Sequence, residues 1–226
     1  MNFKIKRIKL LNALSKTTKA VSIRSPLPVL TGIKFDLHDD CLILTGSDSD
    51  ITIQTKIIKD EDLTIYEIGG VVLNSRYILD IVRKIDSEYI NIQILDGALT
   101  RISSPTSKFD LNGTDILDYP RIDLSKNGIK IDINSLVLKN IISQTKFAAS
   151  DKEHKPILTG INFKATNNQL ECTATDSYRL AKKVVSLNED VTFNITIPQK
   201  SLDEISKIIE KDEIIEMYVS DRKVLY

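Results

Sequence analysis

Two carboxylates, Asp48 and Asp50, are close enough in the sequence to bind one divalent cation, and they are its best candidate for catalytic chemistry. Two carboxylates without further oxygen ligands do not form a coordination shell, so a solvated turn is the favoured interpretation. His38 and His154 have no partners at the spacing of a zinc site. No phosphate loop, dinucleotide fingerprint, zinc-protease helix or serine nucleophile elbow is present. We therefore expect no catalytic residue, no metal site and no cofactor.

The two cysteines, Cys41 and Cys172, are far apart, and each lies near Thr- and Leu-rich segments with strand character. We interpret them as small buried hydrophobic residues, which suits a reducing cytoplasm better than a secreted protein with paired cysteines. Lys9 and Asn12 interrupt the apolar residues of segment 1–14, so it has no core of a secretory signal. No run of about 18 apolar residues predicts a membrane span. The sequence thus predicts a cytoplasmic protein.

Basic residues are unevenly distributed, although the whole chain has 31 Lys and Arg against 31 Asp and Glu. Residues 1–24 contain seven basic residues and no acidic one, whereas residues 36–62 contain eight acidic residues and two lysines. One surface is therefore expected to be basic and another acidic, although the same lysines also suit a solvated helix face.

The chain repeats itself at an offset of 128 residues. Residues 28–35 (PVLTGIKF) return as residues 156–163 (PILTGINF), with six of eight positions identical. Thr45, Asp48 and Ser49 return at the same offset as Thr173, Asp176 and Ser177, and farther along the offset falls to 125. A repeat of this length predicts two copies of one domain. We place them at 1–122 and 129–226, joined by the polar segment 123–128, and expect the second copy to be incomplete at its C-terminal end.

Each copy has the pattern of strands and two helices. Alternating apolar residues predict strands at 3–5 and 129–133, a meander through 33–37, 42–44 and 51–55, and closing strands at 90–95, 99–103 and 107–111. Helical spacing follows the first strand of each copy, with Asn134 placed to cap the second of these helices, and returns at 78–85 and 202–209. The fold class is therefore α+β, with two helices on one face of an antiparallel β-sheet in each copy.

Three motifs carry a resemblance to a known family: SPLPVLTG at 25–32, TGSD at 45–48 and TATDSYRLA at 173–181. In their order, spacing and duplication they resemble the bacterial DNA sliding clamp, the beta subunit of DNA polymerase III, over the whole chain. Members of this family are rings of two chains with three clamp domains each, in which helices line the hole and sheets form the outer wall. The resemblance implies that the third clamp domain is absent here and that this chain alone is a monomer.

The resemblance implies a processivity factor that encircles double-stranded DNA without reading its sequence, and not an enzyme. Phosphate contacts from basic helices are sequence-blind and weaken with salt, so retention must come from the ring. The residues expected nearest the DNA are Arg24, Arg76, Lys152, Lys155 and Lys200.

A second site implied by the resemblance is an apolar pocket on the second copy, which accepts a short peptide tail of a clamp-binding protein. The family usually has glycine and histidine where Ser177 and Tyr178 stand. The matching positions are Leu158, Thr175, Ser177, Tyr178, Arg179 and Leu180.

The implied partners are the catalytic subunit of DNA polymerase III, the clamp loader and other replication and repair proteins, with a homodimeric ring for the full-length chain. Two alternatives remain open at this point: a metal-dependent enzyme based on Asp48 and Asp50, and a non-catalytic α+β interaction module that does not bind DNA. A cationic concave surface favours the clamp, whereas scattered charge favours the interaction module.

Overall fold

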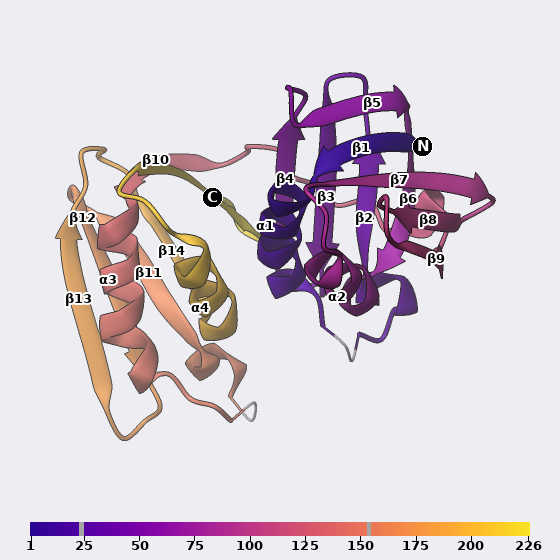
Figure 1. Cartoon of the computed structure of the whole chain (residues 1–226). Coiled ribbons are helices and arrows are strands. Elements are labelled where there is room, and N and C mark those ends of the chain that lie inside the picture. The colour runs from indigo at the N-terminus through magenta and orange to yellow at the C-terminus, as the bar shows by residue number, and fades with distance from the viewer. Residues whose placement is uncertain (23–24, 153–154) are drawn as a thin grey trace. The chain divides into compact units, whose positions relative to one another are not determined.

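The structure is a computed structural model that describes residues 1–22, 25–152 and 155–226. The chain divides into two compact units, Met1–Arg121 and Ile122–Tyr226. In the described residues each unit combines antiparallel sheets with two α-helices (Figure 1), which is the predicted α+β class.

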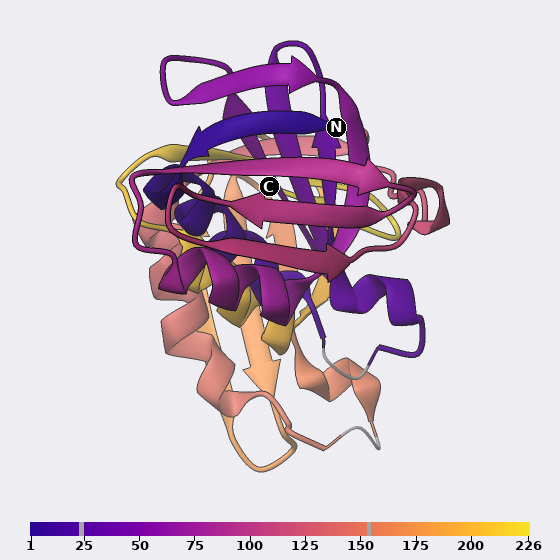
Figure 2. The same ribbon diagram turned by 45° about the vertical axis from the view of Figure 1, so that its right-hand side comes forward.

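The first unit forms two antiparallel sheets. One has the strand order β5-β1-β7-β8-β9, which can be followed from top to bottom in Figure 2, and the other has the order β4-β3-β2-β6. Helices α1 and α2 pack against each other. The strands are β1 (Asn2–Lys6), β2 (Gly32–Leu37), β3 (Cys41–Ser47), β4 (Thr52–Ile58), β5 (Leu63–Glu67), β6 (Gly69–Asn74), β7 (Tyr89–Asp96), β8 (Leu99–Ser103) and β9 (Lys108–Asn112). The helices are α1 (Arg7–Thr17) and α2 (Ser75–Lys84), with 3-10 turns η1 (Thr18–Ala20), η2 (Pro28–Thr31) and η3 (Ile116–Asp118).

The second unit has sheets of order β10-β15-β16 and β13-β12-β11-β14. Helices α3 and α4 lie side by side on one face of the four-stranded sheet (Figure 1). The strands are β10 (Ile129–Asn134), β11 (Gly160–Thr166), β12 (Gln169–Thr175), β13 (Leu180–Ser186), β14 (Phe193–Pro198), β15 (Ile214–Val219) and β16 (Val224–Leu225). The helices are α3 (Ser135–Thr145) and α4 (Gln199–Ile208), with 3-10 turns η4 (Lys146–Ala148) and η5 (Pro156–Thr159).

Each unit has its own hydrophobic core. In the first unit the buried face of β1, with Phe3 and Ile5, meets Leu14 of α1. In the second unit Ile133 of β10 and Leu138 of α3 occupy the equivalent core. Full burial of one such side chain contributes roughly 1.5–3 kcal/mol, so these two clusters supply the main driving force for folding.

Asparagine side chains cap the N-termini of helices α2 and α3. Asn74 accepts hydrogen bonds from the backbone N–H groups of Arg76 and Tyr77 at 3.1 and 3.2 Å. Asn134 does the same for Leu136 and Val137 at 3.0 and 3.2 Å, which confirms the predicted cap. Such caps satisfy N–H groups that have no partner within the helix.

Strand pairing shows that the sequence repeat is also a structural repeat. Ile5 of β1 lies opposite Ile90 of β7, and Ile133 of β10 lies opposite Ile215 of β15. The first residues of these pairs differ by 128 and the second by 125, so the two offsets found in the sequence preserve one register. Helices α2 and α4 begin at Ser75 and Gln199, an offset of 124.

The two units differ where the second one is shorter. Four residues fewer connect β13 to β14 than connect β4 to β6, because the offset falls from 128 to 124 across this segment. The first unit uses the longer connection to form β5, which pairs with β1. In the second unit Glu189 lies there instead, and its carboxylate accepts a hydrogen bond from the backbone N–H of Asp132 at 3.2 Å. A side chain thus takes over part of the role of a lost edge strand.

The polar connector ends at a glycine that the fold requires. Gly128 has a φ of 106°, in the region that favours glycine. A Cβ atom at this position would lie 2.1 Å from the carbonyl oxygen of Val219. Any other residue would therefore displace the start of β10 from β15.

Candidate nucleic-acid interface and peptide pocket

Arg76 and Lys200 occupy equivalent places in the two units, which the sequence alone did not show. Each is the second residue of its helix, α2 or α4, and the two are 124 residues apart, which is the offset of these helices. Both are exposed. The N-terminus of a helix carries partial positive charge, so a basic side chain in the first turn weakens the helix. Neither first turn contains an acidic residue. Both cations therefore lie at a place that the helix dipole does not favour.

Lys152 and Lys155 are exposed and lie between η4 and η5. The hydroxyl oxygen of Ser150 accepts a hydrogen bond from the backbone N–H of Lys152 at 3.1 Å. This contact does not involve the ammonium group of Lys152. Within the parts of the chain that the structure describes, neither lysine makes an ion pair. Arg24, the remaining predicted contact, lies outside the described residues.

Lysines near the N-terminus are largely paired within the first unit. The ammonium group of Lys6 lies 3.2 Å from Asp62, and Lys9 forms an ion pair with Asp60. This contact with Lys9 lowers the pKa of the Asp60 carboxyl. The ammonium group of Lys4 lies 4.8 Å from the centroid of the Tyr89 ring. The acidic segment and the basic segment therefore neutralise each other here, which moderates the charge asymmetry read from the sequence.

The predicted pocket residues 175–180 form one turn between β12 and β13. The Asp176 carboxylate accepts hydrogen bonds from the backbone N–H groups of Tyr178 and Arg179, both at 3.0 Å. The Thr175 hydroxyl donates to the carbonyl oxygen of Arg179 at 2.7 Å. Ser177 has a φ of 78°, in the region where glycine is favoured.

The turn presents its apolar side chains to solvent. The side chain of Tyr178 is 98% exposed and that of Leu180 is 65% exposed. Leu158 lies on η5, which leads into β11. Because Asn162 of β11 pairs with Thr173 of β12, η5 lies at the same end of the sheet as the turn. The structure thus gathers the predicted residues at one sheet end, with Leu158 half-buried.

Two further apolar residues at this sheet end were not predicted. Phe147 on η4 is 56% exposed, and the Arg179 guanidinium carbon lies 5.8 Å from its ring centroid. Ile157, next to Leu158 on η5, is 67% exposed. An aromatic residue directly after the helical pattern was the available signal for Phe147. Arg179 is held by Asp176 at 3.0 Å, so the stacked arrangement is fixed from both sides.

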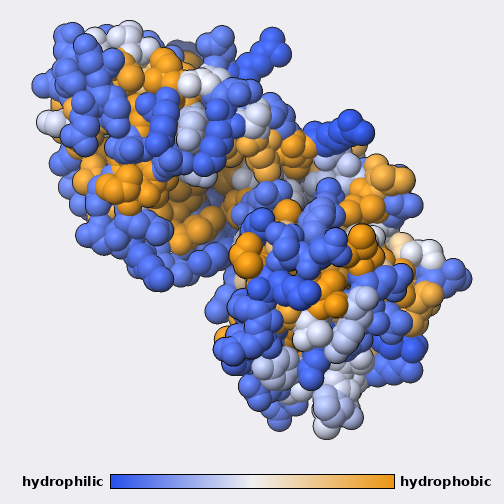
Figure 3. Space-filling model, turned by 90° about the horizontal axis from the view of Figure 1, so that it is seen from above, coloured by the Kyte–Doolittle hydropathy of each residue, from blue (hydrophilic) through white to orange (hydrophobic). Residues whose placement is uncertain are grey.

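A separate shallow groove of about 240 Å³ lies in the first unit, between α2 and the edge strand β9. Apolar side chains dominate it, which was not predicted. Figure 3 shows one face of the molecule, on which hydrophobic patches, in orange, lie within a mostly hydrophilic surface. The lining residues are Tyr77, Asp80, Ile81, Lys84, Phe109 and Leu111.

One of the two carboxylates considered for metal binding, that of Asp48, has structural partners. Asp48 accepts hydrogen bonds from the backbone N–H groups of Asp50 and Ile51 at 3.1 and 2.9 Å. The described residues contain no group of three metal-ligating side chains. Cys41 and Cys172 are both buried thiols, as predicted, and burial raises the pKa of Cys172 well above its usual value. Among the described residues, no helix has the length and apolar character to cross a membrane.

Comparison with known proteins yields matches over both units. The family model described as DNA polymerase III beta subunit, N-terminal domain, matches residues 1–123, and that for the central domain matches residues 132–226. The beta sliding clamps of Bacillus subtilis (strain 168) and Staphylococcus aureus (strain Mu50) are 40% and 41% identical over 233 residues. Each comparison covers 100% of this chain and 62% of the relative, so the chain spans less than two thirds of their length.

Solved structures give the same result. The crystal structure of the DNA polymerase sliding clamp from Bacillus subtilis superposes with a TM-score of 0.96 at 39% identity, covering 99% of this chain and 61% of that one. The beta subunit from Thermotoga maritima has a TM-score of 0.85 at 18% identity, over 99% of this chain and 60% of that one, which is a likeness of fold.

Proposed function

Because the chain belongs to the DNA polymerase III beta subunit family, we propose that its two units act as the first two clamp domains of a ring that encircles duplex DNA. We assign residues 1–122 and 129–226 to these domains. The chain makes or breaks no bond in this role, since it tethers the polymerase and other replication and repair proteins. The interaction module without DNA binding is the rival.

The repeated cations at the first turns of α2 and α4 are the observation that carries the proposal. Arg76 and Lys200 stand at the same position of the repeat. A basic side chain attracts phosphate oxygens without regard to base sequence. Lys152 and Lys155 add charge to the second unit, and Arg24 is proposed as a further contact. Weak, sequence-blind contacts of this kind allow sliding.

Binding to a duplex of random sequence tests this function. We expect the double variant Arg76→Gln, Lys200→Gln to bind more weakly at about 0.02 M salt, and the slope of log K against log salt to fall by about two. The matched control removes two exposed lysines of the sheets, Lys108→Gln and Lys164→Gln, and should bind as the wild type does. No binding by the wild-type chain at low salt would favour the interaction module instead.

A peptide tail of a clamp-binding protein is proposed to bind at the turn of residues 175–180. Exposed Leu180 and Ile157, with Leu158 and the ring of Phe147, provide apolar walls. Arg179 and Thr175 provide polar groups that fix orientation. We expect Leu180→Asp to abolish binding of a fluorescent peptide that copies a polymerase tail. Val184→Asp, an exposed apolar position in the same strand, is the control and should leave the peptide affinity unchanged.

Ring closure is proposed to use the groove between α2 and β9. Strand β9 is an edge of its sheet, so its outer N–H and C=O groups can pair with a strand of another chain. The apolar side chains of Tyr77, Phe109 and Leu111 would be covered in the same step. In the full-length protein, Phe109→Asp should convert a dimer into a monomer in sedimentation velocity.

A further inference from the structure

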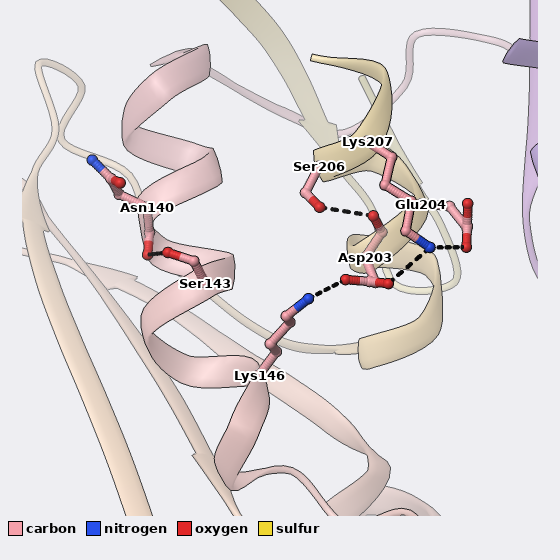
Figure 4. Close-up of polar contacts among 7 residues, drawn as sticks. All are labelled: Asn140, Ser143, Lys146, Asp203, Glu204, Ser206 and Lys207. Carbon is pink, nitrogen blue, oxygen red and sulfur yellow. Dashed lines mark hydrogen bonds and ion pairs between the residues drawn. The ribbon is translucent and has the colours of Figure 1, made fainter. Parts of the chain in front are cut away.

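Helices α3 and α4 are linked by a cluster of charged side chains (Figure 4). The Asp203 carboxylate on α4 binds the ammonium group of Lys146, at the end of α3, through one oxygen. Its second oxygen lies 3.0 Å from the ammonium group of Lys207, one turn along α4. Lys207 also binds Glu204 at 2.6 Å.

This cluster lies next to a proposed DNA contact. Lys200, Asp203 and Lys207 are spaced by three and four residues, so they follow one another along a single face of α4. The opposite face is buried through Leu202. A duplex that contacts Lys200 therefore passes close to the cluster.

The cluster contributes little to folding. The side chains of Lys146 and Lys207 are 38% and 49% exposed, and that of Asp203 is 25% exposed. Ion pairs with this access to water stabilise a protein by about 0–1 kcal/mol. The lysines lower the pKa of the Asp203 carboxyl, so it is ionised near neutral pH. Stability therefore does not explain why Asp203 lies between the two lysines.

The repeat shows that the fold does not require the cluster. In the first unit, the offsets of 128 and 124 place Thr18 where the second unit has Lys146, and Leu79 where it has Asp203. The fold forms there with α1 and α2 packed together. The pairing of α3 with α4 through Asp203 is therefore a feature of the second unit.

We propose that Asp203 is an internal competitor of DNA phosphate, which holds Lys146 and Lys207 and so lowers the affinity of the second unit for the duplex. This inference rests on the proposed DNA-binding function. A carboxylate between two ammonium groups presents the same charged oxygens as a phosphate, so each lysine exchanges one anion for another on binding. Little free energy is gained, and the clamp is held by its ring while it moves freely along the helix.

The variant Asp203→Asn tests the inference, because it keeps the size of the side chain and removes its charge. Each lysine that gains a phosphate contact should increase the slope of log K against log salt by about 0.9 and the affinity at about 0.1 M salt by about eight-fold. The combined variant Asp203→Asn, Lys146→Gln, Lys207→Gln should return to the wild-type affinity. Circular dichroism melting confirms that each variant is folded.

Glu171→Gln is the matched control. Glu171 on β12 pairs with Lys182 on β13 at 2.6 Å, on the face of the sheet away from the helices, so the same charge is removed elsewhere in the same unit. Its DNA affinity should stay that of the wild type. If Asp203→Asn and Glu171→Gln gained the same DNA affinity, the change of net charge alone would explain the effect, and the inference would be overturned.

Failure of the inference differs from failure of the proposed function. If Arg76→Gln, Lys200→Gln weakens DNA binding and Asp203→Asn changes neither affinity nor salt slope, only the inference is overturned. If neither the wild-type chain nor Asp203→Asn binds duplex DNA at about 0.02 M salt, both the proposed DNA-binding function and the inference are overturned.

Discussion

Ser49 and Ser177 stand at the same position of the two repeats and share an unusual backbone, with φ angles of 86° and 78°. In each turn the carboxylate of an aspartate, Asp48 or Asp176, accepts hydrogen bonds from the backbone N–H groups two and three residues later. The repeated Thr, Asp and Ser of this motif therefore build a turn. The Asp48 carboxylate is thus engaged by backbone N–H groups of its own turn.

Replacement of Ser177 by glycine should stabilise the chain. A residue with a Cβ atom is destabilised by roughly 1–2 kcal/mol in the left-handed region, and glycine avoids this cost. About half of the difference is offset because glycine has greater conformational freedom in the unfolded chain. We expect Ser177→Gly to raise the free energy of unfolding by about 0.5–1 kcal/mol in urea titrations. Ser177→Ala, which keeps Cβ, should give no such gain, and equal stability of the two variants would contradict this explanation.

Glu216 predicts a pH-dependent contribution to stability. Hydrogen bonds from Lys126 at 2.7 Å and Lys130 at 2.8 Å lower its pKa from 4.5 to about 2. A carboxyl whose pKa is lower in the folded state stabilises the protein above its unfolded pKa. That contribution declines as the pH falls from 4.5 through 2. Glu216→Gln should therefore be less stable than the wild type at pH 7, and the difference should close near pH 2 in urea titrations.

Residue-scale features were partly predictable. The cap at Asn134 follows from residue type and position alone, and the buried cysteines follow from their strand-like surroundings. The pairing of Lys9 with Asp60 did not follow, because the two residues meet through strand pairing between β1 and β5.

At the scale of elements, the helix N-termini show a conflict between stability and the proposed function. The first turns of α2 and α4 carry Arg76 and Lys200 and no acidic residue. Basic side chains there oppose the helix dipole, whereas the basic last turn of α2, with Arg83 and Lys84, favours it.

Reversal of charge at these positions should increase stability while it weakens DNA binding. We expect Arg76→Glu and Lys200→Glu each to stabilise the chain by about 0.3–1 kcal/mol at low salt, and the gain to disappear at about 1 M salt. Arg83→Glu, in the last turn of α2, should destabilise it. Thermal melting at two salt concentrations measures all three, and a uniform effect of the three variants would exclude the dipole as the cause.

Most elements were predictable from periodicity, and the exceptions have a physical reason. The alternating runs at 33–37, 42–44 and 51–55 became β2, β3 and β4, and the closing strands became β7, β8 and β9. Strands β5, β6, β13 and β14 were not predicted. Edge strand β13 buries few side chains, so its hydrophobic pattern is weak, and its pairing with β12 is decided by tertiary structure.

At the scale of the whole molecule, the two units hold separate cores. The cluster around Phe3, Ile5 and Leu14 belongs to the first unit, and that around Ile133 and Leu138 belongs to the second. The repeat in the sequence predicted this duplication. The change of offset in the sequence did not reveal that the shorter connection between β13 and β14 has no counterpart of strand β5.

Each unit should fold when produced alone. Polypeptides of residues 1–121 and 122–226 each contain one core cluster of buried hydrophobic residues, so we expect each to unfold cooperatively in urea. Fluorescence and far-ultraviolet circular dichroism should give coincident transitions. Loss of cooperative unfolding in either fragment would show that one unit depends on the other for its stability.

The short connection between β13 and β14 has a practical consequence. The second unit has four residues fewer at this place than the first, yet Ile133 pairs with Ile215 as Ile5 pairs with Ile90. The fold therefore accepts a change of length here. Exposed Asn188 in this connection is therefore a suitable anchor for a fluorescent dye or a tether to a glass surface. With such a handle at Asn188 and Glu189 left intact, single molecules can be followed along stretched DNA without disturbing the helices.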